Sequence, residues 1–147
     1  MTVRGKSVEV NIYVDTTIKA PSRGPGKSIY LIECPKHPDN VVKGFSKLQD
    51  TTEDALTLLT IIKALQRFTK KATISIFTKC NGVYHSIDTG RCFKYKENDW
   101  KNSKGQQIKN AELWDILLEI LAKHEWSITQ ADHSFMEYMR TELKRWQ

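Results

Sequence analysis

Three strand-like runs follow one another near the start of the chain, and no helical pattern lies between them. They cover residues 8–15, 27–34 and 40–48. In the first run Val8, Val10, Ile12 and Val14 alternate with other residues, so they share one face of a strand and Asp15 falls on the other. Consecutive strands with short connections predict an antiparallel meander.

A helical pattern then interrupts the strands. Residues 55–68 carry apolar side chains at helical spacing, directly after the capping sequence Thr51-Thr52-Glu53-Asp54. Residues 72–78 form a fourth strand-like run, and a helical crossover makes it parallel to the first. The rest of the chain predicts helices at 81–89, within 91–110, at 111–124 and from about 134, and a fifth strand at 126–130. We therefore predict one mixed α/β domain over residues 1–147 with a five-stranded sheet.

The predicted helix at 111–124 has the clearest amphipathic pattern. Asn110 precedes it and can act as its cap. Its apolar side chains predict a buried stripe made of Leu113, Ile116, Leu117, Ile120 and Leu121.

Composition excludes several classes of protein. The longest apolar stretch, residues 55–65, is interrupted by polar residues and is far shorter than the roughly 20 residues that span a bilayer. The first ten residues lack the apolar core of a signal peptide, and the three cysteines form no CxxC pair. We expect no membrane contact, reduced thiols and a cytoplasmic location.

Positive charge is concentrated in one segment. The chain carries a net charge of +6, and residues 91–110 hold six basic residues against two acidic ones, or +4 of that total. Phe93, Tyr95 and Trp100 lie between the charges. Such a surface favours a phosphate backbone, because neutralised phosphates release counterions and aromatic faces pack on sugars or bases. The alternative is an ordinary solvated helix face.

Four motifs, in this order, resemble type 1 ribonucleases H. They are Ile-Tyr-Val-Asp followed by a loop with Gly24-Pro25-Gly26, then Thr51-Thr52 leading into a helix, then the strand ISIFT with KCNGVYHSI after it, and finally Trp100-Lys101 followed by KNAELW. Enzymes of this family cut the RNA strand of RNA–DNA hybrids with two magnesium ions. The resemblance implies the ribonuclease H-like fold, three antiparallel strands followed by parallel crossovers, flanked by helices.

The same resemblance assigns the positions of four metal-binding carboxylates. Asp15 matches the first, whereas Thr57, Lys79 and about Thr141 stand at the other three. His133 matches the histidine of the loop before the last helix. We therefore expect a divergent member of the family that lacks most of its catalytic carboxylates.

Charge arithmetic argues against two magnesium ions at these positions. Four carboxylates balance two divalent ions, whereas Asp15 and Lys79 together carry no net charge. An ammonium about 4 Å from a divalent ion is repelled by about 8 kcal/mol at an effective dielectric constant of about 20. We expect Asp15 to be a remnant ligand that pairs with Lys79; the alternative is a strand-end aspartate that faces water.

Other candidate ligands have simpler explanations. Glu53 and Asp54 are expected to serve the start of a helix, with a ligand role as the alternative. Asp132 and His133 are alternative ligands of a single ion. Cys34 and His37 have zinc-like spacing but no second pair of ligands elsewhere in the sequence. Gly24-Pro25-Gly26 lacks the ending of a phosphate-binding P-loop, and no catalytic partner is predicted for Cys80.

Three hypotheses follow for function. The first is a ribonuclease H-like protein, not an enzyme, that binds RNA–DNA hybrid, double-stranded RNA or DNA and needs no cofactor. The second is an active nuclease that uses Mg²⁺ or Mn²⁺, with Asp15 as a ligand. The third is a protein-interaction scaffold on the same fold. For the first hypothesis, the predicted nucleic-acid-binding residues are Lys94, Lys96, Trp100, Lys101, Lys104 and Lys109, with Lys19, Arg23 and Lys27 in the early loop.

Overall fold

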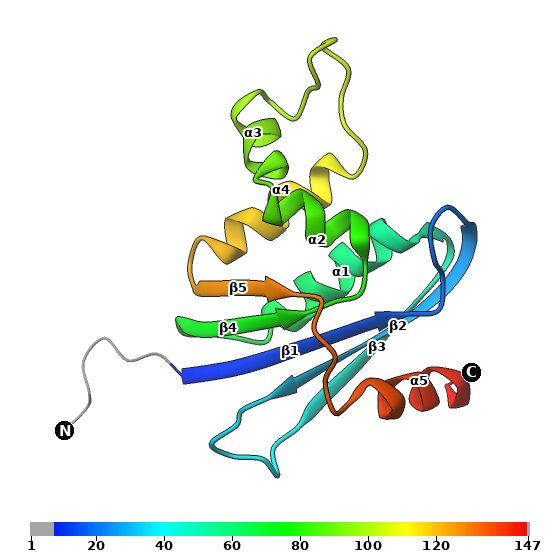
Figure 1. Ribbon diagram of the computed structural model, residues 1–147, viewed down its shortest axis with the longest axis vertical. Helices are drawn as coiled ribbons and strands as arrows, with labels where there is room; N and C mark the ends of the chain where they lie inside the picture. The colour runs from blue at the N-terminus through cyan, green and yellow to red at the C-terminus, as the bar shows by residue number, and fades with distance from the viewer. Residues whose placement is uncertain (1–7, 147) are drawn as a thin grey trace, which may run out of the picture.

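The computed structural model describes residues 8–146, and its centre is a five-stranded mixed sheet (Figure 1). The strands are β1 (Val8–Thr16), β2 (Arg23–Glu33), β3 (Val42–Thr52), β4 (Ala72–Phe77) and β5 (Glu125–Thr129), in the order β3-β2-β1-β4-β5. β1 to β3 pair antiparallel, and β4 runs parallel to both β1 and β5. The predicted fold is therefore confirmed. The predicted domain also includes residues 1–7 and 147, which lie outside the described residues.

Helices cover both faces of the sheet. The first four are α1 (Glu53–Leu65), α2 (Asn81–Asp88), α3 (Arg91–Glu97) and α4 (Ala111–Leu121), and the last is α5 (Met136–Arg145). In Figure 1, α1, α2 and α4 lie above the sheet and α5 lies below it. No helix among residues 8–146 is long and apolar enough to cross a membrane.

The two faces of β1 supply two separate cores. Val10, Ile12 and Val14 are buried in the larger core with α1 and α4, as their alternation predicts. Tyr13 is buried in the smaller core, against Met139 of α5. Because Asp15 follows Tyr13 by two residues, its side chain lies on the α5 face of the sheet.

β2 and β3 extend beyond their predicted limits. Predicted to begin at residue 27, β2 begins at Arg23, and the register shifts between Gly24 and Gly26. Pro25 lacks an N–H group, and this irregularity allows it inside the strand. β3 continues to Thr52, which caps α1 by accepting a hydrogen bond from the Ala55 N–H group at 3.2 Å.

The prediction for α4 was partly wrong. Asn110 occupies the cap position, but its side chain makes no capping hydrogen bond and its φ is 61°. Trp114 and Leu118 are buried, whereas Ile116 of the predicted stripe is 45% exposed. Burial of the large Trp114 ring therefore rotates the buried face of α4 toward Trp114 and away from Ile116.

α5 is fixed to the sheet by packing and by a lysine. Leu143 is buried with Met139 against β1 and β2. Lys27 of β2 donates hydrogen bonds to the carbonyl oxygens of Leu143 and Trp146, each at 2.7 Å. A cation at the last carbonyls satisfies groups that a helix end leaves without partners.

Candidate functional site

A cavity of about 460 Å³ lies between the end of β1 and α5. Three residues predicted for the site, Asp15, Lys79 and His133, line it together. They come from the end of β1, the residues after β4 and the segment before α5. The carboxyl ends of the two parallel strands thus bring together residues that are more than 50 positions apart in the sequence.

Asp15 is engaged by its own loop. Its Oδ1 atom accepts hydrogen bonds from the Lys19 ammonium at 3.1 Å and from the Thr16 N–H group at 2.9 Å. The predicted pair between Asp15 and Lys79 is therefore wrong. Lys19 lies only four residues along the chain, and the loop after β1 brings it back to the strand end.

Lys79 binds the segment between β5 and α5 instead. Its ammonium lies 2.6 Å from the Asp132 carboxylate and also donates to the Gln130 carbonyl oxygen. This ammonium holds the pKa of Asp132 below its usual value. Lys79 therefore fixes the segment that carries His133, and its ammonium already partly neutralises the Asp132 carboxylate.

His133 is held between aromatic rings. Its ring centroid lies 4.3 Å from that of Tyr13 and 5.6 Å from that of Phe77. Its Nδ1 atom accepts a hydrogen bond from the Phe135 N–H group at 3.2 Å, so the neutral ring carries its proton on Nε2. Burial lowers the pKa of His133, and Lys79 lowers it further against the opposite effect of Asp15 and Asp132.

The other two predicted carboxylate positions do not line the cavity. Thr57 is 2% exposed within α1, and Thr141 is exposed on α5. Arg140 and Lys144 line the cavity from α5. The sequence reasoning missed both, although their i, i+4 spacing on an amphipathic helix places them on one face.

The donor set of this cavity does not fit two magnesium ions. The charged residues that line it are Asp15, Lys19, Lys79, Arg140 and Lys144, a net charge of +3. Magnesium needs oxygen ligands and gives up its bound waters reluctantly. The one carboxylate among the lining residues already has an ammonium partner.

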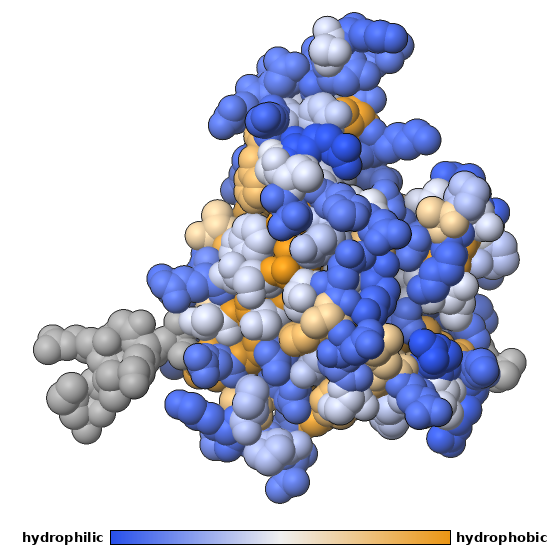
Figure 2. All heavy atoms as spheres, in the orientation of Figure 1, coloured by the Kyte–Doolittle hydropathy of each residue, from blue (hydrophilic) through white to orange (hydrophobic). Residues whose placement is uncertain are grey.

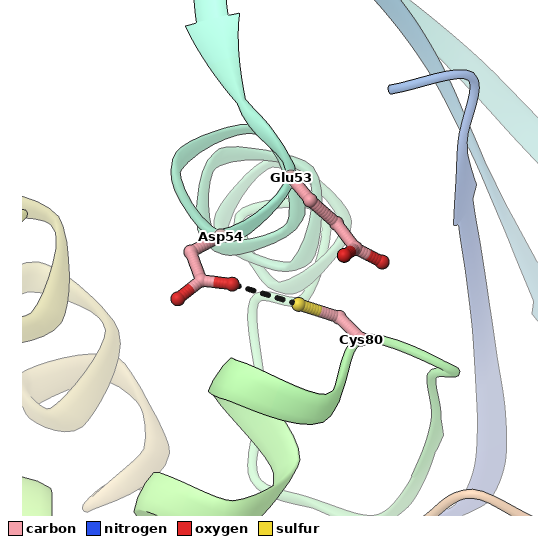
Figure 3. Close-up of side chains that lie close together, drawn as sticks. All are labelled: Glu53, Asp54 and Cys80. Atoms are coloured by element: carbon pink, nitrogen blue, oxygen red, sulfur yellow. Dashed lines mark hydrogen bonds between the residues drawn. The ribbon is translucent and has the colours of Figure 1, made fainter. Parts of the chain in front are cut away.

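A second group of ligand-type side chains lies at the start of α1 (Figure 3). One ligand atom each from Glu53, Asp54 and Cys80 lies within 4.8 Å of the others. The Cys80 thiol donates to Asp54 at 3.2 Å, and Glu53 accepts from the Ala20 N–H group at 3.1 Å. Burial raises the pKa of Cys80 to about 12, and the two carboxylates raise it as well.

These contacts explain the group without an ion. Glu53 holds the loop after β1, and Asp54 connects α1 to the beginning of α2. A Cβ atom on Gly82 would lie 2.3 Å from an Asp54 oxygen, so the close approach requires glycine. Because its thiol stays protonated, Cys80 is a poor nucleophile.

Residues 91–110, here called the handle, project from the body of the molecule above α4 (Figure 1). The visible surface of this part is mostly hydrophilic (Figure 2). Lys94, Lys101, Lys104 and Lys109 are exposed, and none of them has an ion-pair partner within 4.0 Å among residues 8–146. Together with Arg91, which is also exposed and has no such partner among the described residues, these four lysines form the free cationic surface of the handle.

The other two predicted residues of the handle serve its attachment. Lys96 pairs with Asp115 at 2.7 Å and with Glu119 at 2.9 Å, both on α4. Its ammonium lies 5.8 Å from the centre of the Trp100 ring, and Trp100 donates to Asp115 at 3.3 Å. Lys96 and Trp100, both predicted to bind nucleic acid, thus also connect the handle to α4.

The early loop differs from expectation in the same way. Lys19 pairs with Asp15, Arg23 with Asp50 at 2.9 Å, and Lys27 binds the end of α5. Each of these three predicted cations thus has an internal partner, and Arg23 and Lys27 belong to β2.

Comparison with known proteins agrees with the fold. The ribonuclease H family model matches residues 7–132. The chain belongs to the ribonuclease H family. A ribonuclease H of Caldicellulosiruptor saccharolyticus is 32% identical over 117 residues, 79% of this chain and 77% of that protein. One of Roseobacter denitrificans is 36% identical over 118 residues, 76% of this chain and 77% of that protein.

Solved structures of ribonucleases H share the fold. LC9-RNase H1, described as a type 1 enzyme with the type 2 active-site motif, matches with a TM-score of 0.71 and 20% identity, over 92% of this chain and 70% of that one. The foamy viral protease-reverse transcriptase in complex with RNA/DNA hybrid matches with a TM-score of 0.69 and 11% identity, over 94% of this chain and 19% of that one. Membership of the ribonuclease H family gives the chain a function related to nucleic acids.

Proposed function

We propose that this member of the ribonuclease H family binds an RNA–DNA hybrid, or another nucleic-acid duplex, without cutting it by metal-dependent hydrolysis. One observation carries the proposal. The cavity that holds the matched Asp15 is lined by four cations and a single carboxylate, and that carboxylate is paired with Lys19. Two divalent ions need the opposite balance of charge. Residues 1–147 act in this proposal as one ribonuclease H-like domain.

The handle supplies the binding surface in this proposal. Lys94, Lys101, Lys104 and Lys109 are exposed cations on one projecting segment. Lysines placed on phosphates position a duplex but do not read base edges, so we expect little sequence preference. The fold that the chain shares with the hybrid-bound foamy viral protein supports a hybrid as the first duplex to test.

A titration of fluorescently labelled duplexes tests this binding. We expect a rise in anisotropy with RNA–DNA hybrid at about 50 mM salt, with or without magnesium, because the phosphate contacts come from lysines. Equal binding of hybrids with unrelated sequences is expected as well. Failure to bind any hybrid, double-stranded RNA or DNA under these conditions would overturn the proposal and favour a scaffold role.

A further inference from the structure

We propose that the cavity between β1 and α5 binds a nucleoside monophosphate unit directly, without a divalent ion. The phosphate would lie among the cations at Arg140, Lys144 and Lys79. The sugar and base would lie against the apolar wall formed by Met136 and Met139. A phosphate carries up to two negative charges and several acceptor oxygens, which match this lining.

The charges of the cavity favour an anion. Arg140 and Lys144 have no acidic side chain within 4.0 Å among the described residues. Lys19 and Lys79 have one carboxylate partner each, so they are close to neutral as pairs. With both pairs counted as neutral, the charge that remains is +2, carried by Arg140 and Lys144 on α5. Arginine can hold two phosphate oxygens at once, and such charge-assisted bonds are strong.

The remaining lining favours an apolar group next to that anion. Met139 is 1% exposed, Leu143 is 3% exposed and Val14 is 5% exposed, and Met136 is half-buried beside them. Methionine side chains adapt to flat apolar or aromatic surfaces. The volume of about 460 Å³ lies in the range of small-molecule sites and exceeds what an inorganic phosphate needs.

The ligand chemistry has two sources, a free nucleotide and the phosphorylated end of a strand. Both present one phosphate beside one sugar and one base. The inference rests on the proposed function only in having no divalent ion in the cavity, and it does not involve the handle. Loss of nucleotide binding in the cavity would therefore leave duplex binding by the handle intact. Loss of duplex binding by the handle would likewise leave nucleotide binding intact.

Methyl NMR of methionine tests the inference directly, because two of the three methionines of the chain line the cavity. With EDTA present, titration with adenosine monophosphate should shift the Met136 and Met139 methyl signals saturably. Adenosine alone and inorganic phosphate should each bind at least tenfold more weakly. A Met139→Leu variant assigns the signals.

Two variants distinguish binding in the cavity from a general effect of positive charge. Replacing both Arg140 and Lys144 by glutamine should weaken nucleotide binding at least tenfold, since each removes a charge-assisted contact, one tenfold step being about 1.4 kcal/mol. Neither has an ion-pair partner among residues 8–146, so folding should not suffer. Lys123→Gln, an exposed control outside the cavity, should change nothing.

The last arm distinguishes the two sources. A 5′-phosphorylated short single strand that binds more tightly than the free nucleotide, and more tightly than the same strand without phosphate, identifies a strand end. The reverse order identifies a free nucleotide. Absence of methyl shifts with both ligands, or shifts that the double glutamine variant leaves unchanged, would overturn the inference.

Discussion

The salt dependence of duplex binding follows from the number of free lysines on the handle. Lys94, Lys101, Lys104 and Lys109 are available, whereas Lys96 is already paired with α4. Four phosphate contacts at about 0.7 to 0.9 ions each give a slope of log K against log salt of about −3 to −3.6. Between about 50 and 200 mM salt, affinity should then fall by about 100-fold.

Substitution of three of these lysines tests the count. Lys101, Lys104 and Lys109 changed together to glutamine should flatten the slope by about 2 to 2.7, leaving a loss of only about threefold over the same salt range. Anisotropy titrations with a labelled hybrid at four or more salt concentrations would measure both slopes.

Two controls make the result specific to the handle. The triple change of Lys36, Lys70 and Lys71 to glutamine removes the same charge from exposed sites elsewhere and should leave the slope unchanged. Lys96→Gln should loosen the handle without flattening the slope, because that ammonium is already neutralised. A slope that flattens equally in the handle variant and the exposed control would refute the reasoning, since it would reflect total charge.

Three further predictions concern the site and α5. Lys79→Asp should create magnesium binding that calorimetry detects, because it adds a carboxylate beside Asp15 and releases Asp132; identical titrations of parent and variant would contradict this. Lys27→Met should lower the free energy of unfolding by about 1 to 3 kcal/mol, because two carbonyl groups at the end of α5 lose a charged donor. Urea denaturation measures this loss, and an unchanged midpoint would count against the capping role. The pKa of His133 is lowered in the folded state, so the unfolded chain takes up a proton first as the pH falls below 6.5. Stability should therefore decrease with acidification through that window, and more weakly in His133→Gln; an NMR titration midpoint of His133 above 6.5 would refute the assignment.

Much of the fold was predictable because local pattern and packing agree. The alternation in β1 placed Val10, Ile12 and Val14 in one core and Asp15 on the opposite face. The crossover after α1 gave the parallel pairing of β4. Such patterns depend on periodicity alone, which the sequence displays directly.

The predictions failed where contacts between residues far apart in the sequence decide the structure. The start of β2 at Arg23, ahead of Pro25, depended on an irregular pairing with β3 that the sequence does not display. The rotation of α4 depended on burying the large ring of Trp114 in place of Ile116. Local propensity cannot settle either, because the competing partners lie far away in the chain.

In the candidate site too, the sequence predicted some features and missed others. The meeting of Asp15, Lys79 and His133 at one cavity follows from strand order and was expected from the family resemblance. The ion-pair partners were not predictable, because they depend on the paths of two loops. Lys19 reaches Asp15 through one loop, and Asp132 reaches Lys79 through the other.

Cleavage of an RNA–DNA hybrid is the measurement that tests the central claim most directly. Purified protein is incubated with end-labelled hybrid and excess Mg²⁺ or Mn²⁺, beside the Asp15→Asn variant and an active bacterial ribonuclease H. A denaturing gel reports the length of the RNA, and anisotropy on the same samples reports binding. We predict that the RNA stays full-length while the hybrid is bound, with no difference between the parent and the variant. Metal-dependent cleavage by the parent that disappears in Asp15→Asn would contradict the account.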